Sequence, residues 1–103
     1  MATLPKNGML PMHPGEILRE DIFPALGKSK AEIARLLGIS RQTLYDLLAA
    51  KQPITVPMAL RIGKLVGNGP NLWINLQKTY DLKIAQSAMA HEIDRIPTLR
   101  EAA

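Results

Sequence analysis

Five side chains between positions 41 and 46 carry the donors and acceptors that read the edges of DNA bases: Arg41, Gln42, Thr43, Tyr45 and Asp46. Arginine can grip guanine through two hydrogen bonds, and glutamine can do the same with adenine. Threonine and tyrosine can meet a thymine methyl group or a phosphate. Asp46 either accepts a hydrogen bond from a cytosine amine or bonds to Gln42 one helical turn earlier and orients it. The group predicts a base-reading surface.

These side chains act together only if a helix presents them on one face. Ser40 is a good N-cap for such a helix, and its buried side is set by leucines at helical spacing: Leu44, Leu47 and Leu48. At about 100° per residue, the residues opposite are Gln42, Asp46 and Ala49. Thr43 and Tyr45 flank them, and Arg41 projects from the first turn. The helix therefore separates a core face from a polar face.

Residues 30–49, KAEIARLLGISRQTLYDLLA, place this helix second in a helix-turn-helix. Ala34 falls fifth, where the crossing helices leave room only for a small side chain, and Gly38 falls ninth, at the tight turn. The shared core takes the fourth, eighth, tenth, fifteenth and eighteenth positions: Ile33, Leu37, Ile39, Leu44 and Leu47. In this motif the second helix enters the major groove of DNA.

Side chains around the two helices could hold phosphates. Ser29 and Lys30 lie at the N-terminus of the first helix, where free N–H groups and the helix dipole favour anions. The other candidates are nearby basic or hydroxyl residues: Lys28, Arg35, Ser40, Lys51 and Thr55. The alternative is that these are ordinary solvated surface groups.

Composition agrees with a small basic binding domain. The chain has 103 residues, 47% of them hydrophobic but only 4% aromatic, so its core must be built mainly from aliphatic side chains and methionine. The formal net charge of +4 suits an acidic partner such as nucleic acid.

Several function classes are excluded or disfavoured. The chain has no cysteine, so disulfides and thiol chemistry are excluded. His13 and His91 lie far apart without a second ligand at metal spacing, so we expect neither a metal site nor a cofactor. No nucleophile, base and oxyanion donor can be assembled, so we do not expect an enzyme. Without a membrane-length apolar run or a signal-peptide core in residues 1–12, we expect a cytoplasmic protein.

The remaining sequence predicts an all-α fold of five helices behind an extended arm at 1–12. The first helix starts at Pro14 and ends or kinks at Pro24. Ser29 and Glu32 form a capping-box pattern that opens the second helix, whose expected buried stripe is Ile33, Leu36 and Leu37. After the third helix, Thr55 can cap a fourth that closes at residues 67–69. Pro70 starts a fifth, which runs with a bend to about residue 96.

The fifth helix carries aromatic and apolar residues at helical spacing. Trp73, Leu76 and Tyr80 indicate a core or a dimer seam rather than a ligand site. A second stripe continues beyond them: Leu82, Ala85, Met89, Ile93 and Ile96. This stripe either packs on a second subunit or folds back on its own core. Residues 81–103 are thus expected to form a helical extension for a dimer or partner, behind a DNA-binding domain at 13–80.

Residues 7–84 resemble the HigA/VapI-type antitoxins, which belong to the Xre-like repressors. The specific marks are HPGEIL at 13–18 and WINLQ at 73–77. The resemblance implies a lambda-repressor-like fold and a homodimer that binds a palindromic double-stranded operator, represses its own operon and neutralises a small mRNA-cleaving RNase toxin. It implies base-proximal roles for Arg41, Gln42, Thr43 and Tyr45, and backbone contacts for Ser29, Lys30 and Lys51. Ala50 departs from the family, which often has glycine there.

The helix-turn-helix alone does not separate two functions. The first is a repressor that also binds a toxin, as the resemblance implies. The second is a stand-alone Xre-type transcriptional regulator or a protein-interaction module without a toxin partner. A small toxin gene beside this one would favour the first function.

Overall fold

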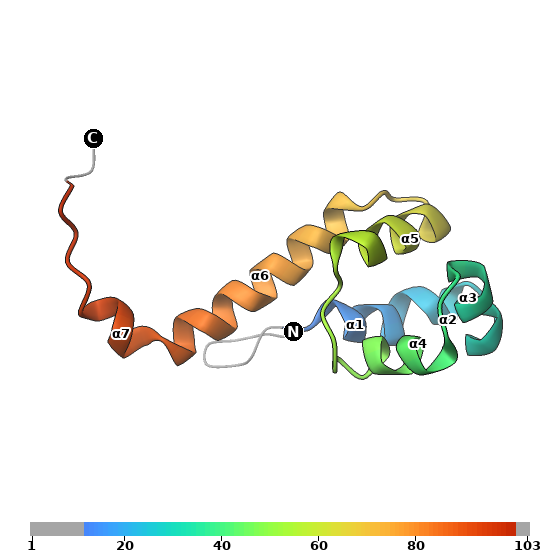
Figure 1. The fold of residues 1–103 in the computed structure, drawn as a ribbon. Helices are drawn as coiled ribbons and strands as arrows, with labels where there is room; N and C mark the ends of the chain where they lie inside the picture. The colour runs from blue at the N-terminus through green and yellow to red at the C-terminus, as the bar shows by residue number, and fades with distance from the viewer. Residues whose placement is uncertain (1–11, 101–103) are drawn as a thin grey trace.

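A computed structural model describes residues 12–100, which form helices joined by short loops (Figure 1). In chain order the elements are α1 (Pro14–Ile17), η1 (Leu18–Ile22), α2 (Phe23–Ala25), α3 (Lys30–Leu37), α4 (Arg41–Leu48), α5 (Val56–Val66), α6 (Asn71–Ala88) and α7 (Ala90–Asp94). No strand occurs in this range, so the all-α prediction is confirmed. The predicted arm lies, except for Met12, outside the described residues.

The first three elements form one continuous helical segment. Its middle, η1, is a π-helix, in which the N–H of Phe23 bonds to the carbonyl of Leu18, five residues earlier. Pro24 follows directly and has no N–H to donate, so the widened turn accommodates it within the helix. The segment therefore ends at Ala25, one residue beyond the proline.

The core is aliphatic around one tryptophan. Its most buried large side chains come from five elements: Leu18, Ile33, Leu44, Leu47, Ile62 and Trp73. One prediction for α3 is wrong, because Leu36 is 44% exposed. Ala34 is buried at the crossing of α3 and α4, as expected, so α3 faces the core through its small residue rather than through Leu36.

The first half of α6 belongs to the chain's own core. Trp73 is 1% exposed, and its Nε1 donates to Asn68 Oδ1 at 3.1 Å. The buried Gln77 accepts the N–H of Ile54 through Oε1 at 2.8 Å, which ties α6 to the loop before α5. Leu76 packs against the same core. Of the two alternatives for Trp73, the core is therefore confirmed and the dimer or partner surface is wrong, because the domain itself encloses the indole.

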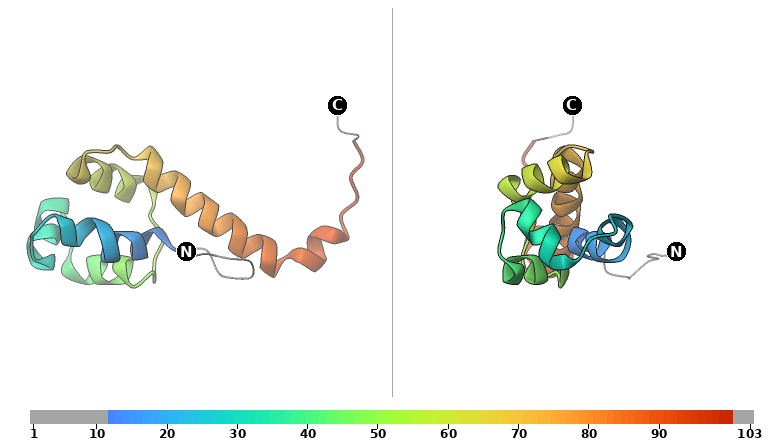
Figure 2. Two further views of the ribbon diagram at one scale, coloured as in Figure 1. Left: turned by 180° about the vertical axis from the view of Figure 1, so that it is seen from behind. Right: turned by 90° about the vertical axis from the view of Figure 1, so that its right-hand side faces the viewer.

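The second half of α6 projects away from the other helices and carries α7 at its far end (Figures 1 and 2). The predicted bend falls at Met89, whose backbone leaves the helical region at φ −109° and ψ 14°. The second apolar stripe is exposed, with Leu82 at 58%, Ile93 at 51% and Ile96 at 64%. The alternative that this stripe folds back on its own core is therefore wrong.

No helix among residues 12–100 has the length and apolar character needed to cross a membrane.

Candidate nucleic-acid interface

The start of α4 is fixed by a double hydrogen bond between Ser40 and Thr43. The Ser40 hydroxyl accepts the N–H of Thr43 at 3.0 Å and donates to Thr43 Oγ1 at 2.9 Å. This confirms Ser40 as the N-cap and shows that both hydroxyls already have protein partners. Arg41 and Gln42 follow the cap and are exposed, so the first turn presents them outward from a fixed backbone.

Asp46 orients Gln42. Gln42 Nε2 donates to Asp46 Oδ1 at 2.9 Å across one turn of α4. This is the second of the two roles expected for Asp46. The amide keeps one N–H and its carbonyl oxygen free, which are the donor and acceptor needed for a two-bond contact with adenine.

The buried and the exposed sides of α4 separate as predicted. Leu44 and Leu47 are fully buried and Leu48 is 4% exposed, whereas Tyr45 is 47% exposed. The structure thus places the expected base-proximal residues on one helix and turns its leucines into the core.

Two arginines hold the C-terminal ends of the helix-turn-helix. Arg61, from α5, donates through Nη1 to the carbonyl of Leu37 at the end of α3, at 2.7 Å. Arg19, from η1, donates through Nη1 to the carbonyl of Leu48 at the end of α4, at 3.1 Å. A cation at a helix C-terminus also interacts favourably with the helix dipole. Sequence reasoning missed both residues, because each contact joins positions far apart in the chain.

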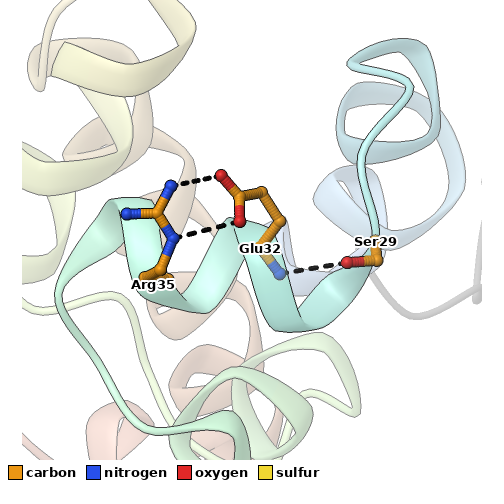
Figure 3. A network of polar contacts seen from close by, with 3 residues as sticks. All are labelled: Ser29, Glu32 and Arg35. Carbon is orange, nitrogen blue, oxygen red and sulfur yellow. Dashed lines mark hydrogen bonds and ion pairs between the residues drawn. The ribbon is translucent and has the colours of Figure 1, made fainter.

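At the N-terminus of α3, two of the expected phosphate contacts, Ser29 and Arg35, are engaged with Glu32 (Figure 3). Ser29 accepts the N–H of Glu32 at 3.1 Å, so the cap is confirmed. The Glu32 side chain pairs with Arg35 instead of completing the capping box, with Arg35 Nε to Glu32 Oε1 at 3.0 Å. The guanidinium lowers the pKa of Glu32. Arg35 is thus partly neutralised.

Lys28 and Lys30 lie beside this terminus. With Arg19 they line a small pocket of about 140 Å³ whose apolar walls include Phe23. Both lysines are exposed, so this end of α3 is positively charged.

The loop after α4 contains the last two expected phosphate contacts. Lys51 is exposed, and its backbone N–H donates to the carbonyl of Asp46 at 2.8 Å. The Thr55 hydroxyl caps α5 by accepting the N–H of Met58 at 3.3 Å. Directly before Lys51, Ala50 has a φ of 60°, a left-handed conformation that glycine adopts at lower cost. At this position, where the family often has glycine, the chain makes the left-handed turn with an alanine.

His13 is a positioning residue that sequence reasoning did not identify. It is 3% exposed and caps α1 by accepting the N–H of Gly15 at Nδ1, at 2.8 Å. Its ring meets Tyr80 of α6 edge to face, with 4.9 Å between ring centroids.

The helix that His13 caps packs closely against α4. A Cβ on Gly15 would lie 2.0 Å from the carbonyl oxygen of Leu47, so α1 packs directly on α4. Burial lowers the pKa of His13, against the opposing effects of Glu16, Asp81 and a backbone hydrogen bond at Gln52.

Taken together, the capped helix pair, its tight turn and the exposed polar face of α4 define a helix-turn-helix protein. The chain belongs to the Xre-like helix-turn-helix family, whose model, described as "Helix-turn-helix", matches residues 18–71.

The sequence is 37% identical over 81 residues to "Virulence-associated protein I" of Dichelobacter nodosus, covering 79% of this chain and 75% of that protein. The fold is similar to that of "Pseudomonas aeruginosa antitoxin HigA with higBA promoter", with a TM-score of 0.81 and 35% identity over 87% of this chain and 99% of that one. It is also similar to "antitoxin GraA in complex with its operator", with a TM-score of 0.82 and 37% identity over 95% of this chain and all of that one. The resemblance to HigA/VapI-type antitoxins is confirmed.

Proposed function

We propose that this chain is a sequence-specific DNA-binding repressor and the antitoxin of a HigBA-type module, which neutralises a small mRNA-cleaving toxin and regulates its own operon. The observation that carries the DNA-binding role is the orientation of Gln42 by Asp46 on the exposed face of a helix held at both ends. A side chain fixed before binding loses less conformational freedom when it contacts a base.

In this mechanism α4 enters the major groove and the rest of the domain grips the backbone. Arg41 and Gln42 select bases, each contributing about 1–3 kcal/mol against the wrong base. Lys28, Ser29 and Lys30 meet one phosphate strand at the start of α3, while Lys51 follows the end of α4. These phosphate contacts supply much of the affinity and make it fall with salt.

A palindromic operator requires two copies of α4. Helix-turn-helix dimers place their recognition helices about 34–36 Å apart, one turn of DNA. The exposed stripe on the outer half of α6 provides a surface for pairing: Leu82, Ala85 and Met89. Such an unpartnered apolar face is typical of an interface. Residues 13–80 then form the DNA-binding domain and residues 81–103 the dimer or partner extension.

The test is a fluorescence-anisotropy titration against the chain's own promoter fragment and a scrambled duplex at several salt concentrations. We expect Arg41→Ala to weaken promoter binding about 5- to 150-fold while scarcely changing binding to the scrambled duplex. Lys78→Ala, which removes one exposed charge from α6, is the control and should affect neither. If Arg41→Ala lowers the affinity for both duplexes equally, Arg41 contacts a phosphate and does not select a base.

Toxin neutralisation rests on membership of the antitoxin family. Co-expression with the small protein encoded beside this gene should restore growth that the small protein alone arrests. If both proteins purify separately and growth stays arrested, the chain acts as a stand-alone regulator.

A further inference from the structure

The apolar surface of α7 needs a partner other than the one that covers α6. The backbone leaves the helical region at Met89, and α7 then turns away from the axis of α6 (Figure 1). A second helix lying along α6 therefore cannot also follow α7. Ile93 and Ile96 would remain exposed at 51% and 64% in such a pair.

The chemistry of α7 is asymmetric. Ile96 follows the end of α7, and its N–H bonds to the carbonyl of Ile93 at 3.0 Å, so this last turn keeps the two isoleucines close together. Glu92 and Asp94 flank Ile93 on its two sides, while His91 and Arg95 fall on the opposite face. Every one of these side chains is exposed. The segment thus presents an apolar strip between two carboxylates.

A groove between α3 and α5 has the complementary character. It has a volume of about 430 Å³ and is lined by Leu36, Leu37, Arg61, Lys64 and Leu65. Leu36 is 44% exposed there. Two cations border the apolar floor, and no carboxylate is among the lining residues. Because α5 lies on the side of the domain opposite α4, DNA held against α4 leaves this groove open (Figures 1 and 2).

We propose that α7 of one copy docks in the groove between α3 and α5 of a second copy, with Ile93 against Leu36 and the α7 carboxylates beside Arg61 and Lys64. This inference rests on the dimer of the proposed function. By symmetry the same contact forms twice, so each copy lends its C-terminal segment to the other.

The length of α6 supports exchange between copies. Its 18 residues span about 27 Å, and they carry α7 away from its own α3 and α5 (Figure 2). The described chain is 52 Å along its longest axis. This reach is comparable with the separation of two half-sites, about 34–36 Å. The second copy's groove is therefore accessible where the chain's own groove is not.

Cross-linking tests the contact directly, because the native chain has no cysteine. The double variant Leu36→Cys, Ile93→Cys is treated with a short bismaleimide at micromolar concentration. We expect most of the chain to become covalent dimer. The matched control is Val56→Cys, Ile93→Cys, which keeps one cysteine on α7 and places the other at the start of α5, where Val56 is 57% exposed and, at about 100° per residue, lies opposite Leu65 of the groove. Equal cross-linking in the two variants overturns the proposal.

Sedimentation of uncross-linked protein tests the dimer separately from the docking of α7 in the groove. Ile93→Ser should raise the dimer dissociation constant about tenfold or more, whereas Val56→Ser, at an exposed position on α5 away from the groove, should not. A wild-type dimer without preferential linkage of positions 36 and 93 overturns the docking alone. A wild-type monomer at every concentration tested overturns the dimer and the docking with it.

Discussion

The helices α4 and α7 both present side chains to solvent, but the chain holds them in opposite ways. α4 has a side-chain cap at its start, an arginine on its last carbonyl and three buried leucines. α7 has no side-chain cap and no buried residue. The comparison separates a surface that contacts within the domain hold in place from one that the domain leaves exposed. Fixed donors suit base reading, and an unpartnered apolar strip suits assembly.

The largest expected effect is on the core beneath α4. Leu44→Ala should lower the free energy of unfolding by about 2–5 kcal/mol, because the side chain is fully buried and its removal leaves a cavity. Ile93→Ala on α7 should change it by less than about 0.5 kcal/mol. Urea denaturation at a protein concentration low enough to keep the chain monomeric measures both. Similar losses would contradict the contrast between the two helices.

The next effect concerns the arginine that holds the end of α3. Arg61→Met keeps the apolar stem but removes the hydrogen bond to the Leu37 carbonyl, which should cost about 1–2 kcal/mol of unfolding free energy. The same measurement on Lys78→Met, which replaces an exposed cation in the middle of α6, serves as the control and should show little change. If the two variants lose the same stability, the hydrogen bond contributes nothing.

A smaller effect should appear as a pH dependence. The folded pKa of His13 is lowered by burial, so the unfolded chain, with a pKa of about 6.5, binds the proton more readily. The contribution of neutral His13 to the free energy of unfolding is therefore fully present above about pH 6.5, and it declines as the pH falls through that value toward the pKa of the folded state.

Variants at the two histidines isolate this slope. His13→Asn keeps an acceptor for the N–H of Gly15 and should flatten the dependence between pH 7 and 5. His91→Asn, on the exposed α7, should leave it as in the wild type. Thermal unfolding across this pH range makes the measurement, and an unchanged slope in His13→Asn would assign the titration to another group.

These contrasts follow what a sequence can and cannot specify. Caps and turns are local, so the roles of Ser29, Ser40 and Gly38 could be predicted from spacing, while the bond between Gln42 and Asp46 was one of two roles expected for Asp46. The contacts of Arg19 and Arg61 join residues 29 and 24 positions apart and leave no periodic signal.

Apolar residues were harder to place than polar ones. Periodicity marks Leu36 and Trp73 as apolar positions on helices, but it does not say which neighbour covers them. The tight crossing at Ala34 left Leu36 outside, and the turn at Asn68 enclosed Trp73. The packing of the helices, rather than the periodicity of the sequence, determines that Leu36 is exposed and Trp73 is buried.

The smallest expected effect concerns the turn at Ala50, where the well-anchored helix α4 ends. Ala50, two residues beyond α4, has a φ of 60°, which costs an L-residue about 1–2 kcal/mol. Ala50→Gly removes this strain but increases the freedom of the unfolded chain, so the net gain should be about 0.5 kcal/mol. Ala49→Gly is the matched control, since Ala49 has a φ of −85° and glycine there should destabilise by about 0.5–1 kcal/mol. Denaturant midpoints moving in opposite directions would establish the left-handed turn, and midpoints that fall together would refute it.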